Sequence, residues 1–270
     1  MTFASALAVL EARSETRILL GLGRVRAHLA RLGDPQRQVP AFHVAGTNGK
    51  GSCCAMLASV LRAAGRRTGL YVSPHLLTVR ERISVDGRPI SAGAFARLMR
   101  RTLAADPKKR LTYFELLTSI AFQHFAANRC DVMVLETGLG GRLDATNVIG
   151  NPLAAIVTSL DFDHEAFLGR TLAAIARQKT GIFKPGRPAV FPDLPVLRRA
   201  VVRGAPVIVR RPWKTVRTDW ARGVQVFVNL TSTSLSGSTT ADFTGFNPKT
   251  LSWGANLVRP RFVVRFTMIE

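Results

Sequence analysis

The stretch that decides the fold runs from Gly46 to Ser52 and reads Gly-Thr-Asn-Gly-Lys-Gly-Ser. It follows the apolar run Pro40–Val44 and precedes Cys53–Ala64, which has the pattern of a helix. A strand, a glycine-rich turn and a helix together arrange backbone N–H groups around a phosphate. The sequence therefore predicts a phosphate loop formed by Gly46, Thr47, Asn48, Gly49, Lys50, Gly51 and Ser52.

The spacing inside this loop differs from that of the common phosphate loop. Lys50 stands where it can reach the terminal phosphates, and Ser52 supplies a hydroxyl near the metal ion. The common loop has four residues between its first glycine and its Gly-Lys pair. Here only two residues separate Gly46 from Gly49, and Gly51 lies between Lys50 and Ser52. This unusual spacing limits the protein families to which the loop can belong.

Short apolar strands alternate with helices on both sides of the loop. The predicted strands are Phe42–Ala45, Thr68–Val72, Asp131–Leu135, Ala154–Thr158, Pro188–Phe191 and Pro206–Val209. The predicted helices are Ser91–Leu103, Thr112–Ala127 and Leu172–Lys179, and residues 1–39 have a helical pattern broken at Gly21–Gly23. Such alternation is typical of an α/β fold with a mostly parallel sheet and helices on both faces.

Polar residues follow several of these strands. Ser73, Glu136 and His164 come after three of them, and ligands of parallel sheets bind at the carboxyl ends of strands. Glu136 closes an apolar strand, where a charged residue is costly unless it faces a ligand or a metal, although a solvent-facing strand end is the simpler interpretation. A role for His164 on magnesium is a hypothesis, because histidine is an unusual ligand for that ion. Lys179 ends a helix, and capping alone accounts for it.

The composition limits the possible functions. The chain has 270 residues, 47% of them apolar, and a formal charge of +21. Its arginines are scattered and aromatic residues are few, so we expect no specific nucleic-acid binding. We expect no membrane span, no secretion signal and no disulfide, and hence a cytoplasmic protein. We also expect a monomer.

The character of the chain changes after about residue 210. Thr231–Thr240 is almost entirely Ser and Thr, and only Val224–Val228 and Phe262–Phe266 look like strands. We therefore divide the chain into a nucleotide-binding domain, 1–210, and an atypical tail, 211–270.

Six segments, in order, resemble the folylpolyglutamate synthase/dihydrofolate synthase family, which belongs to the wider group of ATP-dependent Mur-type ligases. They are HVAGTNGKGS (43–52), YVSPHL (71–76), LTYFE (111–115), LETGLGGRLDATN (135–147), DHEAFLG (163–169) and RQKTGIFKPG (177–186). The resemblance covers about residues 15–190 and implies the central, phosphate-loop domain of a Mur ligase.

The resemblance implies a carbon–nitrogen ligase that uses ATP and Mg²⁺ to join L-glutamate to dihydropteroate or a folate through an acyl phosphate. Gly46–Ser52 would hold ATP, and Ser73, Glu136 and His164 would hold magnesium. Lys50, Lys179 and His164 would serve catalysis, and Lys179 matches a lysine that is carbamylated in the family. The implied pterin contacts are Leu20, Gly21, Leu22, Gly23, Thr112, Tyr113, Phe114, Glu115, Leu143, Asp144 and Ala145.

Two departures from the family pattern stand out. Gly23 occupies a position that is commonly glutamate, and residues 200–270 match no C-terminal ligase motif. We therefore expect the chain alone to bind ATP weakly and to ligate poorly. Two alternatives stay open: a small-molecule kinase or nucleotide hydrolase that uses the same loop, and a nucleic-acid-binding protein motivated by the positive charge.

Overall fold

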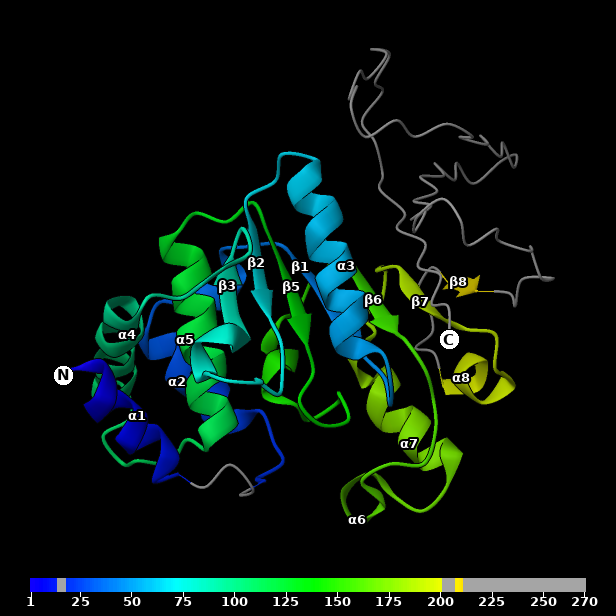
Figure 1. Ribbon diagram of the computed structural model, residues 1–270. Coiled ribbons are helices and arrows are strands. Elements are labelled where there is room, and N and C mark those ends of the chain that lie inside the picture. Colours follow the sequence, from blue (N-terminus) through cyan, green and yellow to red (C-terminus); the bar gives the residue numbers. More distant parts are fainter. Residues whose placement is uncertain (14–17, 201–206, 211–270) are drawn as a thin grey trace. The chain divides into compact units, whose positions relative to one another are not determined.

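The computed structural model of the chain describes residues 1–13, 18–200 and 207–210 (Figure 1). The chain divides into two units, Met1–Trp213 and Lys214–Glu270, and the description concerns the first. The expected strands Val224–Val228 and Phe262–Phe266, and the expected tail, lie outside the described residues.

The first unit is built on one eight-stranded sheet with the order β4-β3-β2-β5-β1-β6-β7-β8. The strands are β1 Ala41–Ala45, β2 Thr68–Tyr71, β3 Ile83–Val85, β4 Arg88–Pro89, β5 Val132–Glu136, β6 Ala154–Val157, β7 Ala189–Pro192 and β8 Val207–Arg210. All pairs are parallel except β2 with β3 and β3 with β4. The predicted mostly parallel α/β sheet is confirmed.

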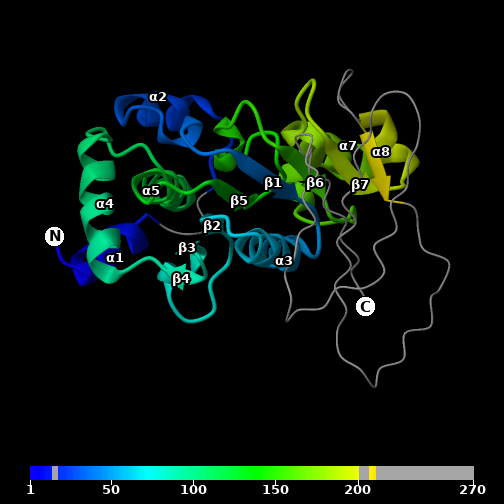
Figure 2. The same ribbon diagram turned by 90° about the horizontal axis from the view of Figure 1, so that it is seen from above.

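Helices cover both faces of this sheet (Figure 2). They are α1 Phe3–Glu11, α2 Gly23–Arg31, α3 Lys50–Ala63, α4 Ala92–Ala104, α5 Tyr113–Ala127, α6 Glu165–Leu168, α7 Leu172–Lys179 and α8 Pro195–Ala200. Helix α3 lies on one face, and α5, α2 and α7 lie on the other. Short 3₁₀ turns occupy Pro35–Arg37, Val79–Arg82, Ala145–Val148 and Thr180–Ile182. Among the described residues, every helix is too short or too polar to span a bilayer.

Two apolar cores form between the sheet and its helices. The larger joins α1, α2, α4 and α5 to β2 and β5, through side chains such as Phe95, Phe122 and Leu135. The smaller packs the turn after α7 against β6 and β7, through Ile182 and Phe191. Both cores pack against the middle strands, whose carboxyl ends lead into the loops of the candidate site.

Predicted helix starts are confirmed by their caps. Ser91 Oγ accepts a hydrogen bond from Ala94 N–H at the start of α4. Thr112 and Glu115 form a capping box at the start of α5, in which each side chain accepts the other residue's backbone N–H, at 3.3 and 2.8 Å. The sequence was sufficient to predict where these two helices begin, because a cap involves only residues three apart.

Three expectations need correction. The sequence interpretation missed the hairpin of β3 and β4, whose Asp86 and Gly87 both have positive φ, as a two-residue turn of this kind requires. Helix α3 begins at Lys50, not at Cys53. Leu19 and Leu20, expected on a helical stripe, precede α2 as exposed, non-helical residues.

Candidate phosphate-loop site

The loop between β1 and α3 requires its first two glycines. Gly46 has φ +153°, and a Cβ there would overlap Thr158 Oγ1 on the neighbouring β6 loop. Gly49 has φ +76° at the N-cap of α3. Both backbone conformations are disfavoured for residues with a side chain. The glycine pattern therefore follows from a tight turn packed directly against β6.

The start of α3 presents backbone N–H groups as possible hydrogen-bond donors. The first-turn N–H groups of a helix have no partner within the helix, and Gly49 provides no side-chain cap. The Lys50 ammonium folds back over the loop, where it donates to the carbonyls of Gly46 and Thr47 at 3.1 and 3.0 Å. Free N–H groups, the positive end of a helix and an ammonium are what an anion such as phosphate needs.

The loop is fastened to residues after β6 that the sequence interpretation missed. Ser159 Oγ accepts from Asn48 N–H at 2.8 Å, and Thr158 Oγ1 donates to the Asn48 carbonyl at 2.6 Å. Thr47 Oγ1 donates to the Asp161 carbonyl and accepts from Asp161 N–H, at 3.1 and 3.0 Å. Residues 158–161 therefore form a latch that holds Thr47 and Asn48. The only sequence signal for it was a run of polar residues directly after an apolar strand.

Glu136 lies beside the phosphate loop at the end of β5. Its side chain is buried, and burial raises the pKa of its carboxyl group, while the Ser73 N–H bond and the Lys50 charge oppose that rise. Ser73 N–H donates to Glu136 Oε2 at 3.0 Å, and a Cβ on Gly51 would lie 3.6 Å from the same oxygen. The structure thus brings Ser73, Glu136, Lys50 and Gly51 together, as the strand-end argument predicted. Gly51, which has no side chain, borders this buried carboxylate.

Asp144 organises the glycine-rich segment after Glu136. Its Oδ2 accepts from the N–H groups of Gly138 and Leu139, both at 2.9 Å, and its Oδ1 accepts from Thr146 N–H and Oγ1. Thr146 Oγ1 is also 2.8 Å from Nε2 of His43, a buried histidine of β1 whose pKa burial lowers to about 3. Both carboxylate oxygens of Asp144 are therefore engaged within the protein, although this residue is among the expected pterin contacts.

Lys179 is a buried lysine at the end of α7. Burial, followed by the nearby positive charge of Lys50, lowers its pKa from 10.5 to about 8, and Asp163 opposes the shift. Gly141 packs against the end of the same helix, since a Cβ there would lie 2.9 and 3.0 Å from the carbonyls of Gln178 and Lys179. The expectation that helix capping alone accounts for Lys179 does not explain its burial. An amine of this kind is partly neutral near pH 8 and therefore nucleophilic.

The pKa of Lys179 leads to a prediction about stability. The pKa of Lys179 is about 10.5 in the unfolded chain and about 8 in the folded chain. Burial of the charged lysine therefore lowers the stability of the fold below about pH 8, and this loss of stability becomes smaller as the pH rises from about 8 to about 10.5. In CO₂-depleted buffer we expect Lys179→Met to unfold at a higher urea concentration than the unmodified chain at about pH 7. The difference should shrink towards about pH 10. A difference independent of pH would contradict the assignment.

Among the described residues, the contacts of His164 do not include the carboxylate of Glu136. It is an exposed residue with φ +46° at the N-cap of α6, and its Nε2 is 3.5 Å from Asp163 Oδ1. In the part of the chain that the structure describes, no three His, Cys, Asp or Glu side chains are spaced to hold a metal ion between them. A role of His164 on magnesium therefore stays a prediction.

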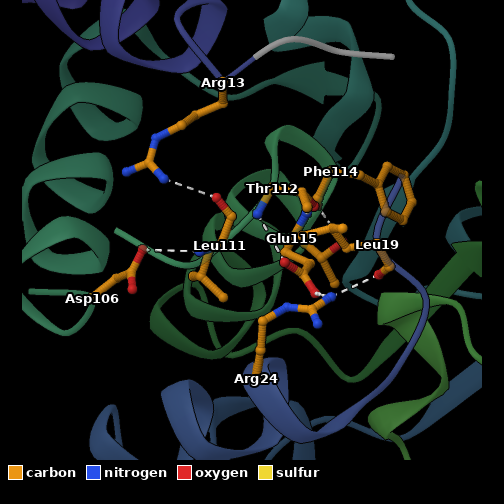
Figure 3. Close-up of polar contacts among 9 residues, drawn as sticks. Arg13, Leu19, Arg24, Asp106, Leu111, Thr112, Phe114 and Glu115 are labelled. Atoms are coloured by element: carbon orange, nitrogen blue, oxygen red, sulfur yellow. Dashed lines mark hydrogen bonds and ion pairs between the residues drawn. The ribbon is translucent and has the colours of Figure 1, made fainter. Parts of the chain in front are cut away.

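Leu19 and Arg24, which flank the expected pterin contacts 20–23, lie beside the expected contacts Thr112, Phe114 and Glu115 (Figure 3). Arg24 Nη2 donates to the Leu19 carbonyl at 2.6 Å and to Glu115 Oε1 at 2.9 Å, which joins the segment before α2 to the start of α5. Arg13 and Asp106 hold the backbone of Leu111 from the other side, at 3.0 and 3.1 Å. The Arg24–Glu115 ion pair was not predictable from the sequence, because its partners are 91 residues apart.

Phe114 connects this region to the carboxylate site. A Cβ on Gly138 would lie 2.7 Å from Phe114 Cζ, so the ring lies directly against the glycine-rich segment after Glu136. Ile18, Leu19 and Leu20 are partly exposed in the same region as Arg24 and Glu115. An apolar surface thus lies next to the candidate phosphate site.

The parallel sheet, the glycine loop and the helix that follows it define this chain as an α/β protein of the phosphate-loop class. Comparison with protein families matches residues 44–193 to the Mur ligase middle domain. The match covers more than half of the chain, so the chain belongs to the Mur ligase family, in its folylpolyglutamate synthase/dihydrofolate synthase group.

Curated relatives agree with this placement. The chain is 45% identical over 177 residues to the dihydrofolate synthase/folylpolyglutamate synthase of Bacillus subtilis, which covers 63% of this chain and 41% of the relative. It is 40% identical over 225 residues to the Escherichia coli protein of the same name, covering 81% of this chain and 53% of the relative. The chain thus spans about half the length of these relatives.

Solved structures show the same fold. The apo form of L. casei FPGS superposes with a TM-score of 0.73 at 33% identity, covering 77% of this chain and 54% of that one. E. coli FolC in complex with DHPP and ADP gives 0.72 at 40% identity, covering 78% and 51%.

Proposed function

We propose that this chain is an ATP-dependent carbon–nitrogen ligase that joins L-glutamate to the carboxylate of dihydropteroate or a folate. The observation that carries the proposal is the convergence of a phosphate loop, a buried carboxylate and an apolar surface on one edge of the sheet. Lys50 and Gly51 border Glu136, and Phe114 packs on the segment that follows it. A folate or pteroate has both a flat apolar ring and a carboxylate, which fits this pair of surfaces.

The residues present fit ATP and magnesium. The N–H groups at the start of α3 and the Lys50 ammonium suit the phosphates, and Glu136 with the Ser73 hydroxyl supplies oxygen ligands of the kind that Mg²⁺ prefers. Mg²⁺ normally keeps several waters and phosphate oxygens, so a site with few protein ligands is sufficient. When bound, ATP supplies the phosphoryl group that activates the substrate carboxylate.

The chain's own residues have separate roles in this proposal. Lys50 neutralises charge on the transferring phosphoryl group, and the latch at 158–161 keeps Thr47 and Asn48 in place while it does so. Asp144 holds the backbone of Gly138 and Leu139, and therefore fixes the surface on which Phe114 lies. Phe114 and the segment 18–20 bind the ring of the pterin substrate.

Carbamylation of Lys179 is part of the proposal. The neutral amine forms a bond from nitrogen to the carbon of CO₂ and releases one proton to solvent, which leaves an anionic carbamate. The lowered pKa of Lys179 supports this step, because the neutral amine is the reactive form. Lys50, whose charge disfavours the Lys179 ammonium, would then stabilise the carbamate. We also propose that the protein is a cytoplasmic monomer.

A pterin-binding experiment tests the proposal. We expect dihydropteroate to bind in the presence of Mg²⁺ and a non-hydrolysable ATP analogue. We expect Phe114→Ala to weaken that binding at least about tenfold, because loss of a large aromatic contact costs more than about 1.4 kcal/mol. Pterin fluorescence measures the affinity. Leu153→Ala, which truncates an exposed apolar side chain elsewhere, is the matched control.

Two outcomes would refute the ligase proposal. One is the absence of saturable pterin binding with the nucleotide analogue present. The other is phosphate release from ATP at the same rate with and without dihydropteroate and L-glutamate, which would indicate a nucleotide hydrolase. Transfer of phosphate to another small molecule would instead favour the kinase alternative.

A further inference from the structure

Five exposed arginines gather at the edge of the sheet opposite the phosphate loop. Helices α3 and α5 end at this edge, strands β2 and β5 begin there, and the turn between β3 and β4 closes there. In Figure 1 this edge is at the top of the sheet, while the phosphate-loop end of α3 is at the bottom. The arginines are Arg62, Arg66, Arg67, Arg88 and Arg129.

Hydrogen bonds bring the segments that carry these arginines together. Asp131 Oδ2 accepts from Arg67 N–H, and Asp86 Oδ1 accepts from Thr68 N–H, both at 2.8 Å. Arg62 lies directly against Gly87, where a Cβ would overlap its Nη1. The two carboxylates of this edge therefore fix its backbone.

The edge keeps a positive charge after its own anions are counted. Asp86 and Asp131 offset two of the five arginines. The carboxyl ends of α3 and α5 add about half a negative elementary charge each. The remaining excess is positive, and it is made of arginine alone, because the segments 62–68, 86–89 and 128–131 contain no lysine.

Arg129 occupies a position that the backbone would favour as glycine. Helix α5 ends in a motif where Cys130 N–H donates to the Phe125 carbonyl and Arg129 N–H to the Ala126 carbonyl, with Arg129 at φ +50°. Helix α3 ends in the same motif, but there the residue with positive φ is Gly65. The left-handed conformation is disfavoured for a residue with a side chain. The arginine at 129 is therefore not explained by the fold.

We propose that this arginine edge binds the sugar–phosphate backbone of double-stranded nucleic acid, without reading its sequence. The guanidinium group matches phosphate oxygens in a two-bond geometry that an ammonium does not offer. Among the described residues, none of the large exposed apolar side chains lies in the three segments, which disfavours a membrane surface. The segments also lack aromatic residues on which single-stranded bases would stack.

Salt-dependent binding to a short DNA duplex tests the proposal. The variant Arg66→Gln/Arg67→Gln/Arg129→Gln should bind the labelled duplex at least about tenfold more weakly than the unmodified chain. The slope of log K against log salt concentration should become smaller by about 2 to 3, because each neutralised phosphate contributes about 0.9 to that slope. The charge-matched control Arg97→Gln/Arg100→Gln/Arg110→Gln alters exposed arginines on and after α4 and should bind as the unmodified chain does. Fluorescence anisotropy without ATP measures both, and thermal unfolding checks that each variant is folded.

Arg129→Gly separates binding from folding. It should leave the melting temperature unchanged or higher, because it relieves the left-handed arginine, yet it should weaken duplex binding. Equal losses in the two triple variants would show that net charge alone drives binding and would overturn the proposal. Absence of duplex binding, tighter binding to single strands, or binding to anionic vesicles alone would overturn it as well.

Discussion

Lys50→Ala is expected to reduce the affinity of the chain for MgATP by about 100-fold. The Lys50 ammonium is the cation inside the loop, and it donates to two loop carbonyls, from which it can turn to phosphate oxygens. Charge-assisted hydrogen bonds to phosphate contribute roughly 3 kcal/mol together, which corresponds to about two orders of magnitude in Kd. Isothermal titration with a non-hydrolysable ATP analogue measures the change.

The matched control for this variant is Lys184→Ala. Lys184 is also a half-buried lysine, but its ammonium donates to Asn147 Oδ1 rather than to the phosphate loop. Its removal should leave nucleotide affinity within about threefold, which is less than 0.7 kcal/mol. Equal affinity for the unmodified chain and Lys50→Ala would show that the loop does not hold the nucleotide. Lys50→Ala should also raise the pKa of Lys179, because a neighbouring positive charge is lost.

Gly46→Ala is expected to destabilise the folded chain by about 3 kcal/mol or more. The φ of Gly46, +153°, is strained for alanine, and the new Cβ would overlap Thr158 Oγ1. Thr158 cannot yield freely, because its hydroxyl donates to the Asn48 carbonyl. For a domain of this size such a loss lowers the melting temperature by roughly 10 °C. Differential scanning calorimetry measures it.

Gly93→Ala is the control for this second variant. Gly93 lies in α4 on the surface, and a Cβ there would meet no atom within 4 Å. Alanine is favoured over glycine in an exposed helix by about 1 kcal/mol, so the variant should melt at the same or a higher temperature. If Gly46→Ala melted like Gly93→Ala, the packing of the loop against β6 would be wrong.

The phosphate loop and its neighbours at the strand ends were predictable because their signals are local. Glycines at 46 and 49 demand a tight turn, and an apolar run that ends in Glu136 marks the carboxyl end of a strand. Since parallel strands end at one edge, Ser73 and Glu136 had to be close, and a hydrogen bond joins them. Neither step required knowledge of long-range packing.

The remainder of the site was not predictable, because it depends on pairs distant in sequence. The latch at 158–161 meets the loop 111 residues away, and Arg24 meets Glu115 across 91 residues. Polar side chains form such contacts with whatever groups the fold places nearby, and the neighbouring residues in the sequence do not reveal which groups those are.

The most direct test of the account is a titration of the unmodified chain with ATP, with and without Mg²⁺. We expect saturable binding of one nucleotide per chain, weakened when the metal is chelated and weakened again by Lys50→Ala. Binding that is absent at millimolar ATP, or that is unaffected by both changes, would contradict the assignment of Gly46–Ser52 as a nucleotide site.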